Sequence, residues 1–247
     1  MNHILKNKRA LITGGSRGIG AAIVKRLASE GADVAFTYTS SPDRANEIVQ
    51  AVQALGVQAL AIQADSADAR EVVAAVEDTV NKLGSIDILV NNAGVLAIGP
   101  IDDFTLADFD RTFAINVRAV FVATQAAVKH MKEGGRIINI GSTNAERMPF
   151  AGGGVYAMSK SALQGLVQGL SRDLGPRGIT INNVQPGPIA TDMNPSEGEF
   201  AEMLKKQIAV ARYGTVDEVA GLVAYLAGPE SGYITGASLM IDGGFSA

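Results

Sequence analysis

Short apolar runs alternate along the chain with longer segments that follow the helical period. The apolar runs lie near residues 9–13, 33–38, 58–63, 86–90, 136–140, 179–184 and 237–241, and several are apolar almost throughout. Continuous apolar runs of this length are typical of parallel strands that helices cover on both faces. The alternation therefore predicts an α/β fold with one doubly wound, seven-stranded parallel sheet flanked by helices and right-handed crossovers.

Glycines mark the points where the helical segments end. Each of five glycines follows a helical pattern and precedes the next apolar run by a few residues: Gly31, Gly56, Gly84, Gly134 and Gly175. These positions predict left-handed C-cap residues. No proline-rich or serine-rich linker interrupts the chain, so residues 1–247 are predicted to form a single domain.

Composition narrows the classes of function. The 247 residues are 47% hydrophobic and carry a net charge of −4, which argues against general nucleic-acid binding because that binding depends on basic surface. The chain has no cysteine and only two histidines, His3 and His130, so neither a thiolate nor a histidine metal cluster is expected. No signal peptide or membrane span is visible, which makes a cytoplasmic location the expectation and excludes a membrane partner.

Ser142, Tyr156 and Lys160 are the strongest candidates for chemistry. On a helix, the four-residue spacing of Tyr156 and Lys160 puts both on one face, where the ammonium is expected to lower the tyrosine pKa from its usual value of about 10. Ser142 closes a strand-like run and could hold a substrate oxygen as charge develops on it. The trio predicts carbonyl reduction or alcohol oxidation, although a lone Tyr-x-x-x-Lys also fits an ordinary amphipathic helix.

Three loops that follow predicted strands carry small or rigid residues. The first has glycines spaced G-x-x-x-G-x-G at Gly14, Gly18 and Gly20, where a strand turning into a helix would bring backbone N–H groups against a pyrophosphate. The second is Asn91-Asn92-Ala93-Gly94 and the third is Pro186-Gly187-Pro188-Ile189-Ala190-Thr191. Each loop taken singly also fits a plain turn or connector.

In this order and spacing, the motifs resemble the short-chain dehydrogenase/reductase family over essentially the whole chain, and its bacterial 3-oxoacyl-carrier-protein reductase branch in particular. The resemblance implies a Rossmann fold and a catalytic tetrad of Asn116, Ser142, Tyr156 and Lys160. It also implies that a dinucleotide binds to Gly14, Ser16, Arg17, Gly18, Ile19, Gly20, Asn92, Ala93, Gly94, Tyr156, Lys160, Pro186, Gly187, Ile189 and Thr191. Thirteen residues separate Ser142 from Tyr156, about one more than is usual in that branch, and the glycines at 152–154 can absorb the difference.

The choice of cofactor follows from charge at the end of the second strand. An acidic residue there would accept from an adenosine ribose, but Tyr38 occupies the position, followed by Thr39, Ser40 and Ser41. Together with Arg17, these hydroxyls suit a 2′-phosphate, so NADPH is favoured over NADH. Arg17 also fits a solvated turn residue, and Ser40 and Ser41 also fit the cap of a helix. By resemblance, Asp65 and Ser66 would bracket the adenine, although Asp65 could equally cap a helix.

The expected reaction is NADPH-dependent reduction of a carbonyl on a small molecule, with Tyr156 as general acid/base. Residues 192–212 lie where the family places a mobile substrate lid, and Met193, Phe200, Met203 and Leu204 fit either an apolar pocket or a packed amphipathic helix. An acyl carrier protein is a further partner to consider, with Lys129 and Arg172 as the basic residues that would hold it.

Two other interpretations stay open, a 3-oxoacyl-carrier-protein reductase of fatty-acid synthesis and a nucleotide-binding regulatory protein with little turnover. The apolar segment 117–128 and the pair Gly165 and Gly169 suggest helix packing between subunits. With the family resemblance, which also involves the segment 241–244, they favour a homotetramer.

Overall fold

Seven parallel strands form one sheet in the order β3-β2-β1-β4-β5-β6-β7. The computed structural model describes residues 3–247. The strands are β1 (Arg9–Ile12), β2 (Asp33–Tyr38), β3 (Ala59–Gln63), β4 (Ile88–Asn91), β5 (Arg136–Ile140), β6 (Thr180–Pro186) and β7 (Ser238–Ile241). The predicted fold class is confirmed, and every strand lies within two residues of its predicted bounds.

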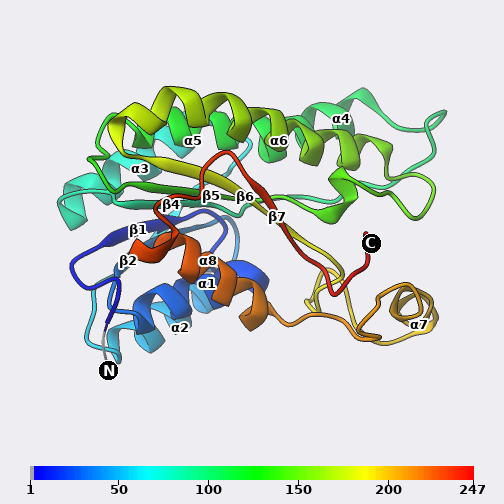
Figure 1. Ribbon diagram of the computed structural model, residues 1–247, viewed down its shortest axis with the longest axis horizontal. Coiled ribbons are helices and arrows are strands. Elements are labelled where there is room, and N and C mark those ends of the chain that lie inside the picture. Colours follow the sequence, from blue (N-terminus) through cyan, green and yellow to red (C-terminus); the bar gives the residue numbers. More distant parts are fainter. Residues whose placement is uncertain (1–2) are drawn as a thin grey trace.

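Helices cover both faces of this sheet (Figure 1). One face carries α1 (Gly18–Ser29), α2 (Pro42–Gln53) and α8 (Val216–Ala227), and the other carries α3 (Ala69–Leu83), α5 (Ala119–Ala127) and α6 (Gly154–Leu174). Successive strand residues point to opposite faces, so Ile12 packs in the core of the first face while Leu11 packs in the core of the second. This is why the strands are apolar throughout and show no alternation.

The order of the strands creates a crevice at the carboxyl edge of the sheet. The chain passes outward from β1 to β3, returns to the centre at β4 and then passes outward to β7. Loops after β1 and β4 therefore diverge to opposite sides, and this switch point is where doubly wound sheets bind ligands. All three loops singled out in the sequence leave the sheet at this edge, after β1, β4 and β6.

Four of the five predicted C-cap glycines have left-handed backbone, with φ of 95° at Gly31, 84° at Gly56, 87° at Gly84 and 85° at Gly134. The prediction for Gly175 is wrong, since its φ is −53°. Residues Gly175–Arg177 form a 3-10 turn that extends α6, because Pro176 fits the first turn of a helix. The left-handed residue is Gly178, with φ of 69°.

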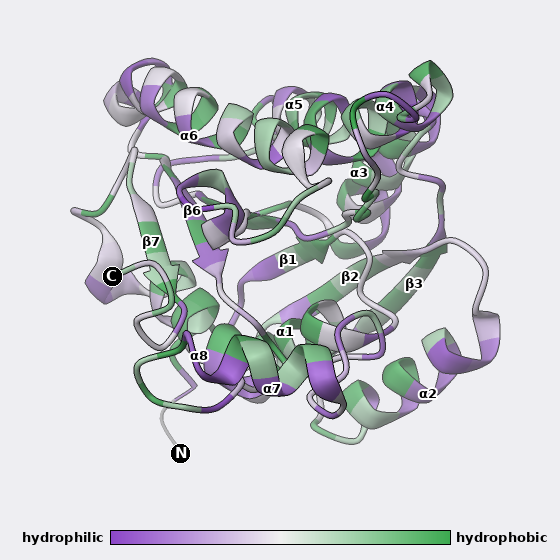
Figure 2. Cartoon of the chain, turned by 90° about the vertical axis from the view of Figure 1, so that its right-hand side faces the viewer, coloured by the Kyte–Doolittle hydropathy of each residue, from purple (hydrophilic) through white to green (hydrophobic). Residues whose placement is uncertain are grey.

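Two further segments frame the crevice. α4 (Leu106–Phe113) passes through a π-helical turn at Ala114–Arg118 into α5. α7 (Glu199–Lys205) lies away from the sheet, and in the view of Figure 2 it stands in front of α8 and α1, below the strands. A small apolar cluster of Ala201, Leu204, Ile208, Tyr213 and Phe245 joins α7 to the C-terminal segment. Within residues 3–247, no helix has the length and apolar character needed to cross a membrane.

Candidate active site

The glycine turn between β1 and α1 is built for close backbone approach. Gly14 and Gly18 have φ of 67° and 53°, which other residues rarely adopt. A Cβ atom on Gly20 would lie 2.2 Å from the Gly14 carbonyl oxygen, so no side chain fits there. α1 starts after Arg17 with no side-chain cap and no acidic residue in its first turn. Its N–H groups and positive dipole end are therefore free for an anion, which fits a cofactor pyrophosphate.

Hydroxyl and amide groups hold this turn in place. The Asn92 side-chain amide donates to the carbonyl oxygens of Thr13 and Gly14 at 2.9 and 3.0 Å. The Thr13 hydroxyl accepts from the N–H groups of Asn92 and Ala93, and the Thr37 hydroxyl accepts from Gly14. Asn92 thus supports the glycine turn with its side chain. Thr13 and Thr37 were not predicted as site residues, because a hydroxyl at the end of a strand is their only signal in the sequence.

The three strongest candidates for chemistry meet at the carboxyl end of β5. Ser142 follows β5 and is buried, and its side chain lies near enough to the Tyr156 phenol, in the first turn of α6, to act on the pKa of that phenol. Lys160 lies one turn further along α6, also buried, with Nζ donating to the Ile140 carbonyl at 2.8 Å. The Lys160 Nζ atom is 5.9 Å from the centre of the Tyr156 ring.

The pKa of Tyr156 is raised in the structure, whereas the spacing of Tyr156 and Lys160 predicted a lowered value. Burial raises the pKa of Tyr156, and the neighbouring Ser142 side chain acts in the lowering direction without reversing the result. Burial also lowers the pKa of Lys160 to about 8. The expected net lowering of the tyrosine pKa is therefore not found, because desolvation of the buried phenol outweighs the lowering contribution.

Asn116 lies in the π-helical turn, where its side chain is fully engaged. Its oxygen accepts from the Val95 N–H at 2.9 Å, and its amide donates to the Val95 carbonyl and the Ser159 hydroxyl, both at 3.0 Å. It therefore ties the loop after β4 to α6, next to Lys160. A π-turn shifts the helical hydrogen-bond pattern at this point, a feature frequent at functional sites.

The loop after β6 closes the other side of the crevice. The methyl carbon of Thr191 lies 3.7 Å from the position a Cβ would take on Gly18, which places Thr191 against the glycine turn. The Pro186 carbonyl accepts from the Thr143 hydroxyl, and Gly187 is packed so tightly against Asp242 that a Cβ would lie 2.6 Å from it. The Ile189 side chain is buried in the core.

The end of the crevice near β2 and β3 is open. Thr39, Gln63, Asp65 and Glu71 line a pocket of about 420 Å³ there. Ser40 is exposed and Ser41 partly exposed, whereas Tyr38 is packed against the core. Asp65 accepts from the Ala67 N–H at 2.9 Å, while Asp68, not Asp65, caps α3.

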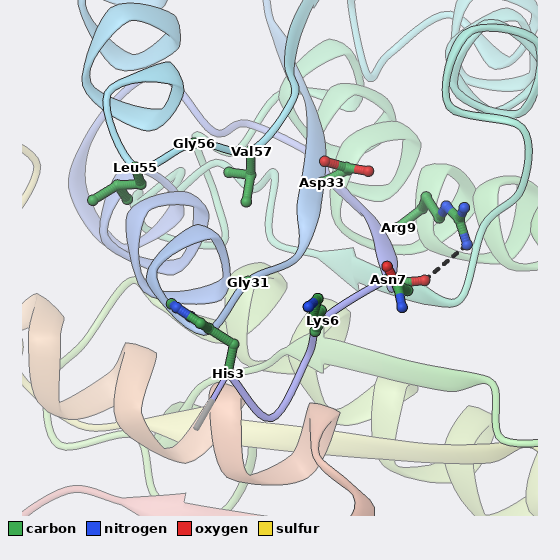
Figure 3. Close-up of a pocket in the computed structure, with 9 residues that line it drawn as sticks. All are labelled: His3, Lys6, Asn7, Arg9, Gly31, Asp33, Leu55, Gly56 and Val57. Carbon is green, nitrogen blue, oxygen red and sulfur yellow. Dashed lines mark hydrogen bonds between the residues drawn. The ribbon is translucent and has the colours of Figure 1, made fainter. Parts of the chain in front are cut away.

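A second pocket, of about 270 Å³, lies at the opposite edge of the sheet (Figure 3). His3, Lys6 and Asp33 are among the residues around it, near the start of β1 and β2. Arg9 donates there to the Asn7 carbonyl at 2.7 Å. This pocket contains none of the predicted site residues.

Comparison with known proteins identifies the family. A family model described as Enoyl-(Acyl carrier protein) reductase matches residues 14–246. A short-chain dehydrogenase/reductase from Serratia marcescens is 64% identical, with a TM-score of 0.98 over 99% of this chain and 100% of that one. The chain belongs to the short-chain dehydrogenase/reductase family. The resemblance inferred from the sequence motifs is confirmed.

Other family members differ in what their names state. A short-chain dehydrogenase from Burkholderia cenocepacia, solved in complex with NADP, is 56% identical with a TM-score of 0.97 over 99% of this chain and 100% of its own. The cyclic-di-GMP-binding biofilm dispersal mediator protein of Escherichia coli is 52% identical over 97% of this chain and 98% of its own length. The 3-oxoacyl-(acyl-carrier-protein) reductase FabG of Staphylococcus aureus is 39% identical over 96% of this chain and 97% of its own length.

Proposed function

We propose that the protein is an NADPH-dependent carbonyl reductase that converts a ketone or 3-oxoacyl group to an alcohol. The observation that carries this proposal is the placement of Ser142 beside Tyr156, with Lys160 buried one turn away. The pair lies at the same edge of the sheet as the glycine turn. A proton donor and an anion-binding turn at one crevice suit a reaction that joins proton and hydride transfer.

The chain's own residues supply the proton and hold the carbonyl. When bound, NADPH supplies a hydride to the carbonyl carbon. Ser142 donates a hydrogen bond to the carbonyl oxygen, and Tyr156 gives that oxygen a proton as negative charge develops. Because burial raises the pKa of Tyr156, the phenol carries its proton at neutral pH, the form that reduction requires. Lys160 holds the nicotinamide ribose, and Asn116 supports the proton relay toward Lys160.

NADPH is favoured over NADH by the residues around the second strand. No carboxylate occupies the end of β2, where Tyr38 is followed by Thr39, Ser40 and Ser41, and Arg17 is exposed at the glycine turn. Three similar proteins, 50% to 57% identical, were solved with NADP or NADPH. In this assignment the phosphates lie on residues 14–20, the adenine between Asp65 and Ser66, and the nicotinamide beside residues 92–94 and Thr191.

The proposal extends to assembly, location and substrate access. The protein acts as a cytoplasmic homotetramer on a small carbonyl compound, and residues 192–212 form its lid. In that segment Leu204 is buried in the small apolar cluster, whereas Met193, Phe200 and Met203 are 55%, 51% and 43% exposed. Phe200 contacts Phe150 edge to face at 5.8 Å, so the exposed side of α7 faces the loop before Tyr156. That arrangement suits an apolar substrate group.

A second candidate function is regulatory binding of a nucleotide. It is supported by the 52% identity to the cyclic-di-GMP-binding protein of Escherichia coli. A regulatory protein has no need for a protonated Tyr156 beside Ser142, which is why reduction is the first choice.

The test is NADPH oxidation with ketones, diketones, and 3-oxoacyl thioesters both free and attached to carrier protein. Tyr156→Phe is expected to lower kcat by a factor of about 10² to 10⁴, the usual contribution of a positioned general acid. The variant should keep its NADPH affinity, measured by nicotinamide fluorescence. NADPH binding without turnover of any carbonyl, together with saturable binding of cyclic di-GMP, would move the assignment to the regulatory function.

A further inference from the structure

An ion pair joins the two halves of the molecule across the crevice. Arg44 lies in the first turn of α2, and its guanidinium is 3.2 Å from the carboxylate of Asp192, which follows the β6 loop. The two residues are 148 positions apart in the chain. β2, which leads into α2, and β6 are separated in the sheet by β1, β4 and β5, so the contact spans the switch point.

Arg44 and Asp192 both lie close in the chain to residues that were assigned to the cofactor. Arg44 comes three residues after Ser41, in the first turn of the helix that directly follows the residues assigned to the 2′-phosphate. Asp192 comes directly after Thr191, which lies against Gly18 at the start of α1. The pair therefore connects the start of α2, directly after the 2′-phosphate residues, to Asp192, the first residue of the lid segment.

The ion pair between Arg44 and Asp192 contributes little to the stability of the protein. The Arg44 and Asp192 side chains are 54% and 72% exposed, and exposed pairs of this kind contribute about 0–1 kcal/mol. A phosphate monoester carries a charge of about −1.5 to −2 and three acceptor oxygens, and it binds arginine through two parallel hydrogen bonds. A phosphate beside Ser40 and Ser41 would therefore compete well with one exposed carboxylate for Arg44.

We propose that Arg44 is a specificity-determining ligand of the adenosine 2′-phosphate and that it leaves Asp192 when NADPH binds. This inference rests on the proposed cofactor. It has a consequence for the lid segment, because Asp192 loses its bond to α2 when the 2′-phosphate is present and keeps it when NADH binds. Cofactor selection and the freedom of the lid segment then depend on one arginine.

The first experiment compares dissociation constants for NADPH, NADH and 2′,5′-ADP by calorimetry. Arg44→Gln should weaken NADPH and 2′,5′-ADP roughly tenfold, as expected for one lost charge-assisted hydrogen-bond pair, and leave NADH unchanged. Asp192→Asn should leave NADPH binding equal or tighter, because it removes the competitor. Arg70→Gln is the matched control, since Arg70 is also an exposed arginine in the first turn of a helix, paired with Asp68 at 3.0 Å.

The second experiment reads the lid segment without turnover. Amide hydrogen exchange of residues 192–198 should speed up when the wild-type protein binds 2′,5′-ADP and not when it binds 5′-AMP, which lacks the 2′-phosphate. In Arg44→Gln this segment should exchange fast without any ligand.

The outcomes separate the two proposals. Equal weakening of NADPH and NADH in Arg44→Gln, or no weakening of either, would overturn the role of Arg44 while leaving the reductase in place. A wild-type protein that binds neither NADPH nor 2′,5′-ADP would overturn the proposed cofactor and this inference with it.

Discussion

At the scale of single residues, the buried ammonium of Lys160 links protonation to stability. Its pKa of about 8 in the folded chain lies below the ordinary lysine pKa of 10.5 that it regains on unfolding. Between these values the unfolded state binds more protons, so the free energy of unfolding rises with pH. Below pH 8 both states are protonated, and the burial penalty is present in full.

The lowered pKa of Lys160 predicts how the stability of the protein depends on pH. Relative to Lys160→Met, the wild-type protein should gain about 3 kcal/mol in unfolding free energy as pH rises from 8 toward 10.5. Denaturant titrations of both proteins at pH 7, 8, 9 and 10 measure the difference. Parallel pH profiles for the two proteins would contradict the lowered pKa. The comparison with Lys160→Met cancels groups that titrate in both proteins, such as Tyr156.

For single residues, the sequence predicted positions where their spacing along the chain follows the period of a helix or the end of a strand. The spacing of Tyr156 and Lys160 predicted their shared helix face, and the end of an apolar run predicted the position of Ser142. The direction of the Tyr156 pKa shift could not be predicted, because it depends on how deeply the fold buries the phenol. Pairing of Arg44 with Asp192 has no local signal at all.

At the scale of elements, the glycine turn and α1 depend on the absence of side chains. Gly20→Ala would place a Cβ 2.2 Å from the Gly14 carbonyl oxygen and 2.5 Å from the Asn92 amide. We expect it to lower the unfolding free energy by about 1–3 kcal/mol through overpacking and to weaken NADPH binding.

Gly221→Ala in α8 is the matched control for that variant. Its Cβ would meet only the Arg26 guanidinium, at an ordinary 3.6 Å. In a helix interior the change should raise stability by about 0.5–1 kcal/mol. Thermal unfolding and NADPH titration of both variants measure the contrast, and equal effects would mean that close packing at Gly20 is not required.

Arg147 joins three elements at the mouth of the crevice. Its guanidinium donates to the Phe245 carbonyl, lies 5.4 Å from the centre of the Phe245 ring and donates to Gln207 at 3.3 Å. It thus links the loop between Ser142 and Tyr156 to the C-terminal segment and the end of α7.

Arg147→Ala should therefore loosen the lid segment. We expect a loss of about 1 kcal/mol in stability, faster protease cleavage within residues 192–212, and a rise in KM that exceeds any fall in kcat. Arg172→Ala, at an exposed arginine on the far part of α6, is the control. Cleavage at the same rate in both variants would argue that Arg147 does not restrain the segment.

Helices and strands were predicted well from the sequence where burial requires apolar residues. The strands followed from continuous apolar runs, since both faces of the sheet are covered. The π-turn at Ala114–Arg118 could not be predicted, because its apolar pattern is the same as that of an α-helix. Gly175 was misplaced because a 3-10 turn through Pro176 extends α6 by three residues.

At the scale of the whole molecule, exposed apolar side chains support the proposed homotetramer. Phe121 on α5 and Met240 on the edge strand β7 are each 46% exposed. On α6, a Cβ added at Gly165 or Gly169 would meet nothing within 4 Å, so these positions leave room for a neighbouring helix.

The prediction is a solution mass four times that of the 25.6 kDa chain, measured by light scattering. Phe121→Glu should reduce that mass, because a buried interfacial charge without a partner is strongly unfavourable. Leu55→Glu, at an apolar residue 49% exposed beside α2, should leave it unchanged. A monomer mass for the wild-type protein would end the proposal.

The strand order also bears on how the protein is synthesised. β1 is made first but lies inside the sheet, and its residues Ala10, Leu11 and Ile12 pair with Ile88, Leu89 and Val90 of β4. Until the ribosome has completed β4, the nascent β1 has a free edge along three consecutive apolar residues, and exposed edges of this kind promote aggregation. A chain stopped between β3 and β4 should therefore be insoluble, and the two halves of the sheet cannot be expected to fold as separate fragments.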